Sequence, residues 1–460
     1  MRIVDLRPGE GRTTWSAFAT LLGIAAAHTL LETGRDALFL THLPVERLPF
    51  LYLAIAAVGL ALTRAKPRGA PGPFMVTQAL AGAGVVTFGF WVASAWSESP
   101  ALLYALYLWS GLFASWVVLR FWLVLGETFT VDRAKRLYGF VGAGSVLGAL
   151  LGASLARTLA LHLAPRHLLL ASAGALVLTA ALPSVVLAST RPPGDATTPK
   201  AKPPLASAGS AGSVGLAADL RLVQDSPFLS RILALVLVST VTVTLADYLF
   251  KSIVASRVPA AELGATFATV AIATNAIALF TQLVLVGFVL RTFGVHRALW
   301  VMPALLLFAS SGLLVTGGLL AALLLKGVDG SLRHSLHRTS TELLYVPLGD
   351  RERARAKPFI DLVAQRGGQA VASLAILALV SLGFGNRTLA AVATVLAGLW
   401  MVVARAVHRP YLDLFRATLR EGKLDYRGEL PVLDLDALET LFAALSSPKD
   451  IEVVAAIDLL

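Results

Sequence analysis

Ionisable side chains lie inside long apolar stretches of this sequence, and they are the residues best placed to do chemistry. One set follows three- and four-residue steps, the spacing of a single helical stripe: Lys326, Asp329, Arg333 and His337. A charge at the centre of a bilayer costs at least ~2.5 kcal/mol on insertion scales, so such groups face a polar cavity or a partner. The excess of cations in this stripe predicts an anionic ligand or several carboxylate partners.

Two further apolar stretches carry charges in the same way. Glu32, Arg35 and Asp36 lie together in the first stretch. Asp247 and Lys251 lie one helical turn apart in the seventh. Local ion pairing that merely neutralises these groups explains each set alone about as well as a polar path does, but their recurrence on several segments favours the path.

Arginine is suited to phosphate, because its guanidinium can donate two parallel hydrogen bonds. Arg35, Arg333 and Arg338 are therefore candidate phosphate clamps. The alternative for Arg338, and for Glu342 beside it, is a position in the cytoplasmic headgroup region. The full set of candidate substrate-binding residues is Arg35, Glu127, Asp247, Lys251, Lys326, Arg333 and Arg338.

Composition excludes several other classes of protein. Apolar residues make up 56% of the 460 residues and charged residues 15%, against about 25% charged in a soluble domain. The absence of cysteine excludes disulfides and thiol chemistry, and the histidines lack metal-ligand spacing. No catalytic triad or carboxylate pair is present. We expect neither an enzyme nor a cofactor nor a metal site.

The apolar stretches predict an all-α membrane protein with twelve transmembrane helices. We expect them at residues 14–41, 49–64, 73–96, 101–128, 137–161, 167–190, 228–256, 263–290, 298–317, 318–346, 356–383 and 386–408. The net charge of +11 gathers in alternate loops, which indicates cytoplasmic loops and cytoplasmic termini rather than a nucleic-acid partner. The expected location is the bacterial inner membrane.

The chain divides into four expected parts: a six-helix half over residues 1–190, a cytosolic linker over 191–227, a second half over 228–409, and cytosolic amphipathic helices over 410–460. The halves echo each other, since Asp36-Ala-Leu-Phe matches Asp247-Tyr-Leu-Phe. Two parallel six-helix repeats are the plan of the major facilitator fold. The segment from Leu435 to Leu460 is similar to one helix pair of a HEAT repeat, so further repeats are expected in a cytosolic domain beyond it.

Four segments resemble the ATP/ADP translocase-type nucleotide transporters of plastids and intracellular bacteria, a major-facilitator-like family with a subgroup fused to HEAT-like repeats. The segments are GRDALFLTHLP, GETFTVDRAKRLYGFVGAGSVLGALLG, LADYLFKSIVAS and GSLRHSLHRTSTELLYVPLGDRERARAKPFIDLVAQRGGQA. They fall in both halves, so the resemblance covers essentially all the expected transmembrane helices.

The resemblance implies a nucleotide held by two basic and two acidic residues inside the membrane. Arg35 stands at the position of the first basic residue, Glu127 at that of one acid, and Asp247 at that of the other. The second basic position is a lysine in the family and is Thr341 here. Arg338, one turn earlier, is the residue that could supply the missing charge.

We therefore expect a transporter of nucleotides, ATP/ADP or a related anionic metabolite, working by alternating access as an exchanger. One alternative is a membrane sensor or scaffold that no longer transports and signals through its cytosolic repeats. Another is an exporter or flippase of an anionic amphiphile, which would need a cavity open sideways to lipid. The expected partners are a small anionic solute and the lipid bilayer.

Overall fold

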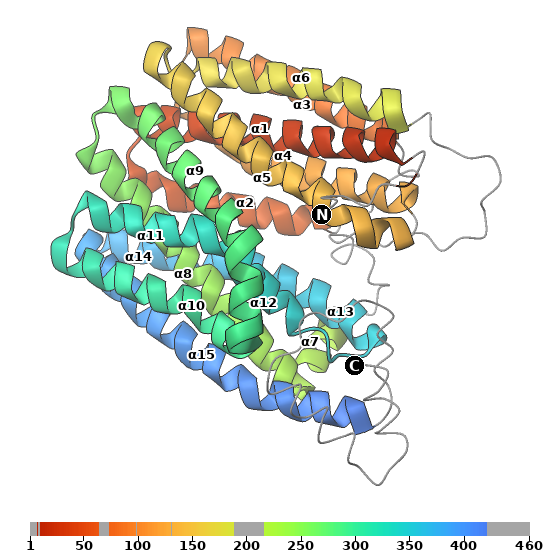
Figure 1. Ribbon diagram of the computed structural model, residues 1–460. Helices are drawn as coiled ribbons and strands as arrows, with labels where there is room; N and C mark the ends of the chain where they lie inside the picture. The colour runs from red at the N-terminus through yellow and green to blue at the C-terminus, as the bar shows by residue number, and fades with distance from the viewer. Residues whose placement is uncertain are drawn as a thin grey trace. The chain divides into compact units, whose positions relative to one another are not determined.

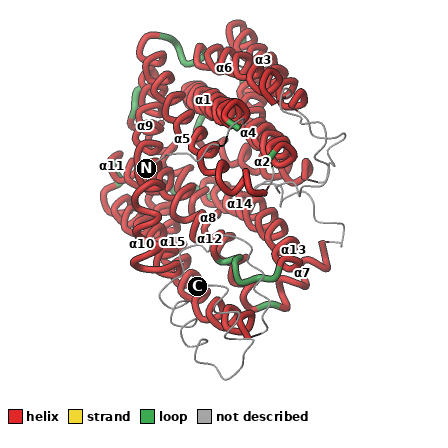
Figure 2. The backbone as a smooth tube through the Cα atoms, turned by 45° about the vertical axis from the view of Figure 1, so that its right-hand side comes forward, coloured by secondary structure: helices red, strands yellow, loops and turns green. Residues whose placement is uncertain are grey.

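The computed structural model describes residue 7 and residues 10–63, 73–97, 99–129, 131–187 and 216–420. All regular structure in these ranges is helical (Figure 2). The described helices include eight that are long and apolar enough to cross a membrane. The chain is therefore an all-α membrane protein, as the apolar stretches predict, while the number of twelve crossings stays a prediction.

The helices group into two compact units, of which the first holds Met1–Ser207 together with Val254–Ala276. Its helices are α1 (Gly11–His42), α2 (Leu48–Thr63), α3 (Pro73–Trp96), α4 (Pro100–Thr128), α5 (Val131–His162) and α6 (His167–Leu187) (Figure 1). Helix α1 packs against α4, α5 and α6, and α3 packs against α4 and α6. Helix α1 therefore lies at the centre of this unit's contacts.

Helices α1 and α5 approach each other closely because α5 carries glycines at four-residue spacing. A Cβ atom added at Gly148 would lie 2.1 Å from the carbonyl oxygen of Leu22, and Gly144 and Gly152 also face the backbone of α1. A Cβ at Gly142 would meet nothing within 4 Å. Gly144, Gly148 and Gly152 thus allow the close helix packing that small residues at four-residue spacing favour.

The second unit holds Ala208–Ile253 together with Ile277–Leu460. Its helices include α7 (Leu216–Asp225), α10 (Val286–Thr316), α11 (Leu319–Leu332), α12 (Arg338–Leu343), α13 (Asp350–Ile360), α14 (Gly368–Ser381) and α15 (Asn386–Arg420). Helices α8 (Pro227–Arg257) and α9 (Leu263–Phe280) each have residues in both units. Three π-helical segments interrupt the α-helices of this unit: η5 (Thr281–Leu285), η6 (Arg333–His337) and η7 (Asp361–Gly367).

Most predicted helix positions agree with the structure, and the differences have local causes. Predicted helices eight and nine are joined at Gly294, whose φ of 76° breaks an otherwise continuous helical path. Helix α15 continues through Pro410 to Arg420, beyond the predicted end at residue 408. Helix α7 lies within residues 191–227, where the sequence predicts a linker. The rest of that linker, up to residue 215, and the HEAT-like segment after residue 420 lie outside the described residues.

Candidate functional site

A network of alternating charges links helices α8 and α11. The Lys326 ammonium donates to Asp247 Oδ1 at 2.6 Å, and the Lys251 ammonium lies 3.1 Å from the other oxygen of that carboxylate. Lys251 is buried, with 5% of its surface exposed. Asp247 therefore holds two lysines at once, one from its own helix and one from α11. The cation stripe thus has a carboxylate partner on another helix, one of the two kinds of partner that its charge predicts.

The network continues along α11 into η6. Arg333 donates from Nε and Nη2 to the two oxygens of Asp329, both at 2.7 Å, in the bidentate geometry that guanidinium and carboxylate favour. The same carboxylate lies 3.8 Å from the Lys326 ammonium. Among the described side chains, three cations thus alternate with two carboxylates along this network.

The π-helical backbone of η6 changes the directions in which its side chains point. A π-helical turn is wider than an α-helical turn and is frequent at functional sites. Arg333, the first residue of η6, has 35% of its side chain exposed although its partner Asp329 is buried. The ring of His337 lies 5.0 Å from that of Trp400, and its buried Nδ1 has no hydrogen-bond partner. The accessible end of the network is therefore Arg333.

Arg35 lies in the first unit and is fully engaged there. Its Nε donates to Asp36 at 2.9 Å, its Nη1 to the Ser110 hydroxyl at 2.7 Å, and its Nη2 to Glu32 at 3.3 Å. The guanidinium also lies over the Tyr107 ring, 4.1 Å from the centroid. This geometry agrees with the local ion pairing that the sequence leaves open as the alternative to a phosphate clamp.

Two partners of Arg35, Ser110 and Tyr107, do not appear among the sequence candidates. Both lie on α4, three residues apart, which places them on one helical face. The signal that could have revealed them is weak, since a serine and a tyrosine in an apolar helix usually serve helix packing.

The remaining candidates differ in how the structure presents them. Arg338 is exposed at the start of α12 and has no ion pair among the described residues. Glu342 forms an ion pair with Lys357 of α13. Glu127 is near the end of α4, where its side chain falls outside the described part of the structure.

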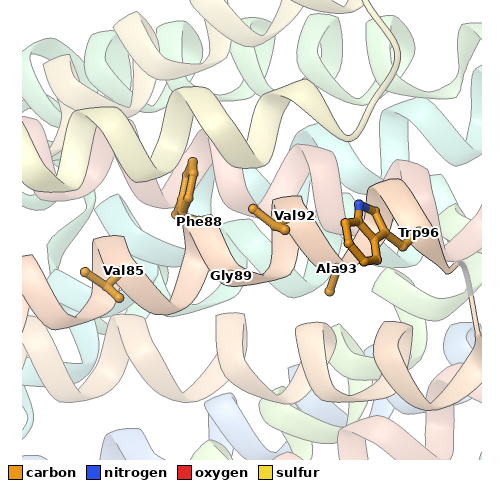
Figure 3. Close-up of a pocket in the computed structure, with 6 residues that line it drawn as sticks. All are labelled: Val85, Phe88, Gly89, Val92, Ala93 and Trp96. Carbon is orange, nitrogen blue, oxygen red and sulfur yellow. The ribbon is translucent and has the colours of Figure 1, made fainter.

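An open apolar hollow of about 410 Å³ lies along α3 and does not coincide with these charges. Figure 3 shows its lining residues spaced along this one helix: Val85, Phe88, Gly89, Val92, Ala93 and Trp96. Several of them are strongly exposed, Trp96 at 89%. A row of exposed apolar side chains on a spanning helix is what contact with lipid requires, so the charged network remains the candidate site.

No protein-family model and no curated protein matches this sequence. Solved structures do match it. A bacterial metal transporter aligns with a TM-score of 0.57 at 14% identity, over 86% of this chain and 98% of that one. An autoinhibited peptide transporter of the POT family gives 0.54 at 14% identity, over 86% and 96% of the two chains. The nucleoside transporter NupG gives 0.53 at 14% identity, over 88% and 99%.

The chain has the major facilitator fold. This confirms the fold that the paired halves predict, over most of the chain's length. At 14% identity the likeness establishes the fold alone, and the solutes of these three transporters differ from one another.

Proposed function

We propose that this protein is a secondary transporter that moves a nucleotide or a related anionic metabolite across the membrane by alternating access. The observation that carries the proposal is the network of α8, α11 and η6, in which three cations alternate with two carboxylates. Cations inside an apolar segment are costly unless anions lie near them, so a site rich in lysine and arginine favours an anionic solute. A phosphate group is a counterion of suitable charge and hydrogen-bonding capacity.

Two arginines are available to such an anion. Arg333 is partly exposed while its other side is fixed by Asp329, so its guanidinium is oriented before a ligand binds. Arg338 lies five residues further along and is exposed without an ion pair among the described residues. It supplies the charge that Thr341 lacks at the corresponding position of the ATP/ADP translocase-type family. We propose Lys251, Lys326 and Asp247 as the buried support of these two arginines.

The charge of the site also decides between solute classes. The names of the three similar transporters give a metal, peptides and nucleosides as their solutes. The fold alone therefore does not determine the class of solute. A neutral nucleoside gains little from lysine and arginine side chains, whereas the phosphate of a nucleotide can accept hydrogen bonds from them. Anionic nucleotides are therefore the first solutes to test, and exchange of one for another is the expected mode.

In the major facilitator fold the solute binds near the bilayer midplane between the two repeats. We propose that Arg35 on α1 and Glu127 on α4 also lie along the solute path. Both termini are proposed to be cytoplasmic, because the basic loops alternate with loops poor in Lys and Arg.

The test is uptake of radiolabelled nucleotides into proteoliposomes that hold the purified chain, with and without counter-solute inside. We expect saturable uptake of ATP, ADP or a nucleoside monophosphate, faster with internal nucleotide, and little uptake of the matching uncharged nucleoside. Liposomes containing the Arg333→Ala/Arg338→Ala variant serve as the control for specific flux. Binding without any flux would instead support a non-transporting sensor, and saturable flux of the nucleoside alone would refute the anionic site.

A further inference from the structure

Among the described carboxylates of the spanning helices that are at least partly buried, Asp361 differs from the others in having no cation bound to it. Asp361 is the first residue of η7 and is only partly exposed. In the described part of the chain its side chain has neither an ion pair nor a hydrogen bond. The other partly or fully buried carboxylates that the structure describes in these helices each have an ion pair: Asp36, Asp247, Asp329 and Glu342.

The nearest candidate cation is already occupied. Lys357 lies one helical turn before Asp361, but its ammonium bonds to Glu342 of α12 instead. Arg338 on α12 is exposed and interacts with Asp361 only at longer range. Tyr345 follows α12, and its buried hydroxyl has no hydrogen-bond partner in the described residues. The groups that act electrostatically on Asp361 are thus Lys357, Glu342, Arg338 and Tyr345.

A partly buried carboxylate without a partner is stable when neutral, because its charged form loses water and gains no counterion. Lys357 can neutralise one of its two neighbouring carboxylates at a time. While it holds Glu342, Asp361 takes up a proton more readily than a carboxylate in water does. If Lys357 or Arg338 turns to Asp361, the charged form becomes favourable and the proton is released.

We propose that Asp361 is the proton-carrying group of this transporter and couples solute movement to a proton gradient. The inference rests on the proposed transport function and adds its energy source. In each cycle the carboxylate takes one proton from the side to which it is open and releases that proton on the other side. The π-helical turn of η7 supports the role, since such turns give a side chain a different direction from a regular α-helix.

The experiment uses the full chain in proteoliposomes with the membrane potential clamped and a pH gradient imposed. With one proton per solute, a gradient of one pH unit should support about a tenfold accumulation of labelled ATP, ADP or AMP. Asp361→Asn mimics the protonated state, so it should lose this accumulation and keep exchange of labelled for unlabelled nucleotide at equal pH. Glu352→Gln, an exposed carboxylate on α13, is the matched control and should keep both.

The outcomes separate the two proposals. The coupling role would be overturned if wild-type flux did not depend on the pH gradient, or if the Asp361→Asn variant still accumulated nucleotide. Either result would leave the transport function intact. No flux of any nucleotide in either mode would refute the transport function, and the coupling role with it. If the variant does not fold, a pH dye inside wild-type liposomes gives the answer: a nucleotide gradient should move protons, and an unchanged dye signal would overturn the proposal.

Discussion

The ammonium of Lys326 on α11 lies 2.6 Å from the Asp247 carboxylate on α8, and this contact joins two helices that are distant in the sequence. It is supported on both sides, by Lys251 on α8 and by Asp329 on α11. Because a lone charge is costly in an apolar surrounding, each member of this network depends on the others. Removing one should therefore affect both folding and binding.

The first prediction concerns that dependence. Asp247→Ala leaves Lys251 and Lys326 without their shared carboxylate and should destabilise the protein by about 3–5 kcal/mol. Adding Lys326→Ala removes one of the two cations that have lost this carboxylate, so the double variant should recover part of the loss. Melting temperature in one detergent, measured for both single variants and the double variant, checks this. Strictly additive losses would show that the pair is not coupled.

The second prediction concerns Arg333. If it binds a phosphate oxygen, Arg333→Ala should cost about 1.5–3 kcal/mol of nucleotide binding, roughly one to two decades in affinity. Arg333→Lys should recover only part of this, because a lysine cannot bond both oxygens of Asp329 and keep the fixed geometry. Titration calorimetry with ADP measures the effect. An affinity for ADP equal to that of the wild type in Arg333→Ala would remove this residue from the site.

The third prediction concerns the α1–α5 contact. Gly148→Ala places a Cβ atom 2.1 Å from the carbonyl oxygen of Leu22, so the two helices must move apart. We expect a loss of about 1–3 kcal/mol or more from this overpacking. Gly142→Ala is the matched control on the same helix, because nothing lies within 4 Å of its added Cβ. Its melting temperature should equal or exceed that of the wild type, since alanine favours helix over glycine.

The fourth prediction concerns pH and the residue that precedes α1. Glu10 accepts hydrogen bonds from Arg133 Nε at 2.8 Å, from Arg136 Nη2 at 3.0 Å and from the backbone N–H of Arg7. Burial alone would raise its pKa, but these bonds outweigh burial and lower the pKa of Glu10 from 4.5 to about 2. The carboxylate therefore stabilises the fold only when it is charged.

The sign of the pH dependence follows from that shift. The contribution of Glu10 is fully present above about pH 4.5 and is lost as the pH falls through about 2. Glu10→Gln should thus lower the melting temperature near neutral pH, and the difference from wild type should shrink as the buffer is acidified below 4.5. A difference that does not change over this range would argue against the ion pairs.

Much of the fold follows from the lengths of the apolar stretches, because a span of about 20 such residues has few alternatives. Helix α3 begins and ends at the predicted residues, 73 and 96. Helix α7 shows the limit of that signal. It is short and polar on one face, and its place is fixed by the ion pair of Asp219 with Arg355 of α13, a tertiary contact that composition does not reveal.

The candidate site was predictable in its charges and not in its pairing. Spacing places Lys326, Asp329 and Arg333 on one stripe, and the structure shows them linked by ion pairs. That Lys326 pairs with Asp247 of another helix does not follow from spacing. The π-helical segments η6 and η7 were not predictable, since widening a single turn leaves no periodic trace in the sequence. Nor does spacing reveal that Lys357 pairs with Glu342, because the choice between two carboxylates depends on how α12 and α13 lie together.

The last prediction separates a structural role of Arg35 from a binding role. The described geometry gives three of its nitrogens a partner, so Arg35→Ala would leave Asp36 buried without its cation and Ser110 without its donor. We expect a loss of several kcal/mol in stability, with ADP affinity in the surviving folded protein near that of the wild type. Arg35→Lys should restore part of the stability, since a lysine can neutralise Asp36 but cannot also reach Glu32 and Ser110 in the same geometry. Melting temperature and ADP affinity, measured on one purified sample of each variant, distinguish the two roles. A tenfold or greater loss of ADP affinity at unchanged melting temperature would show that Arg35 binds the phosphate.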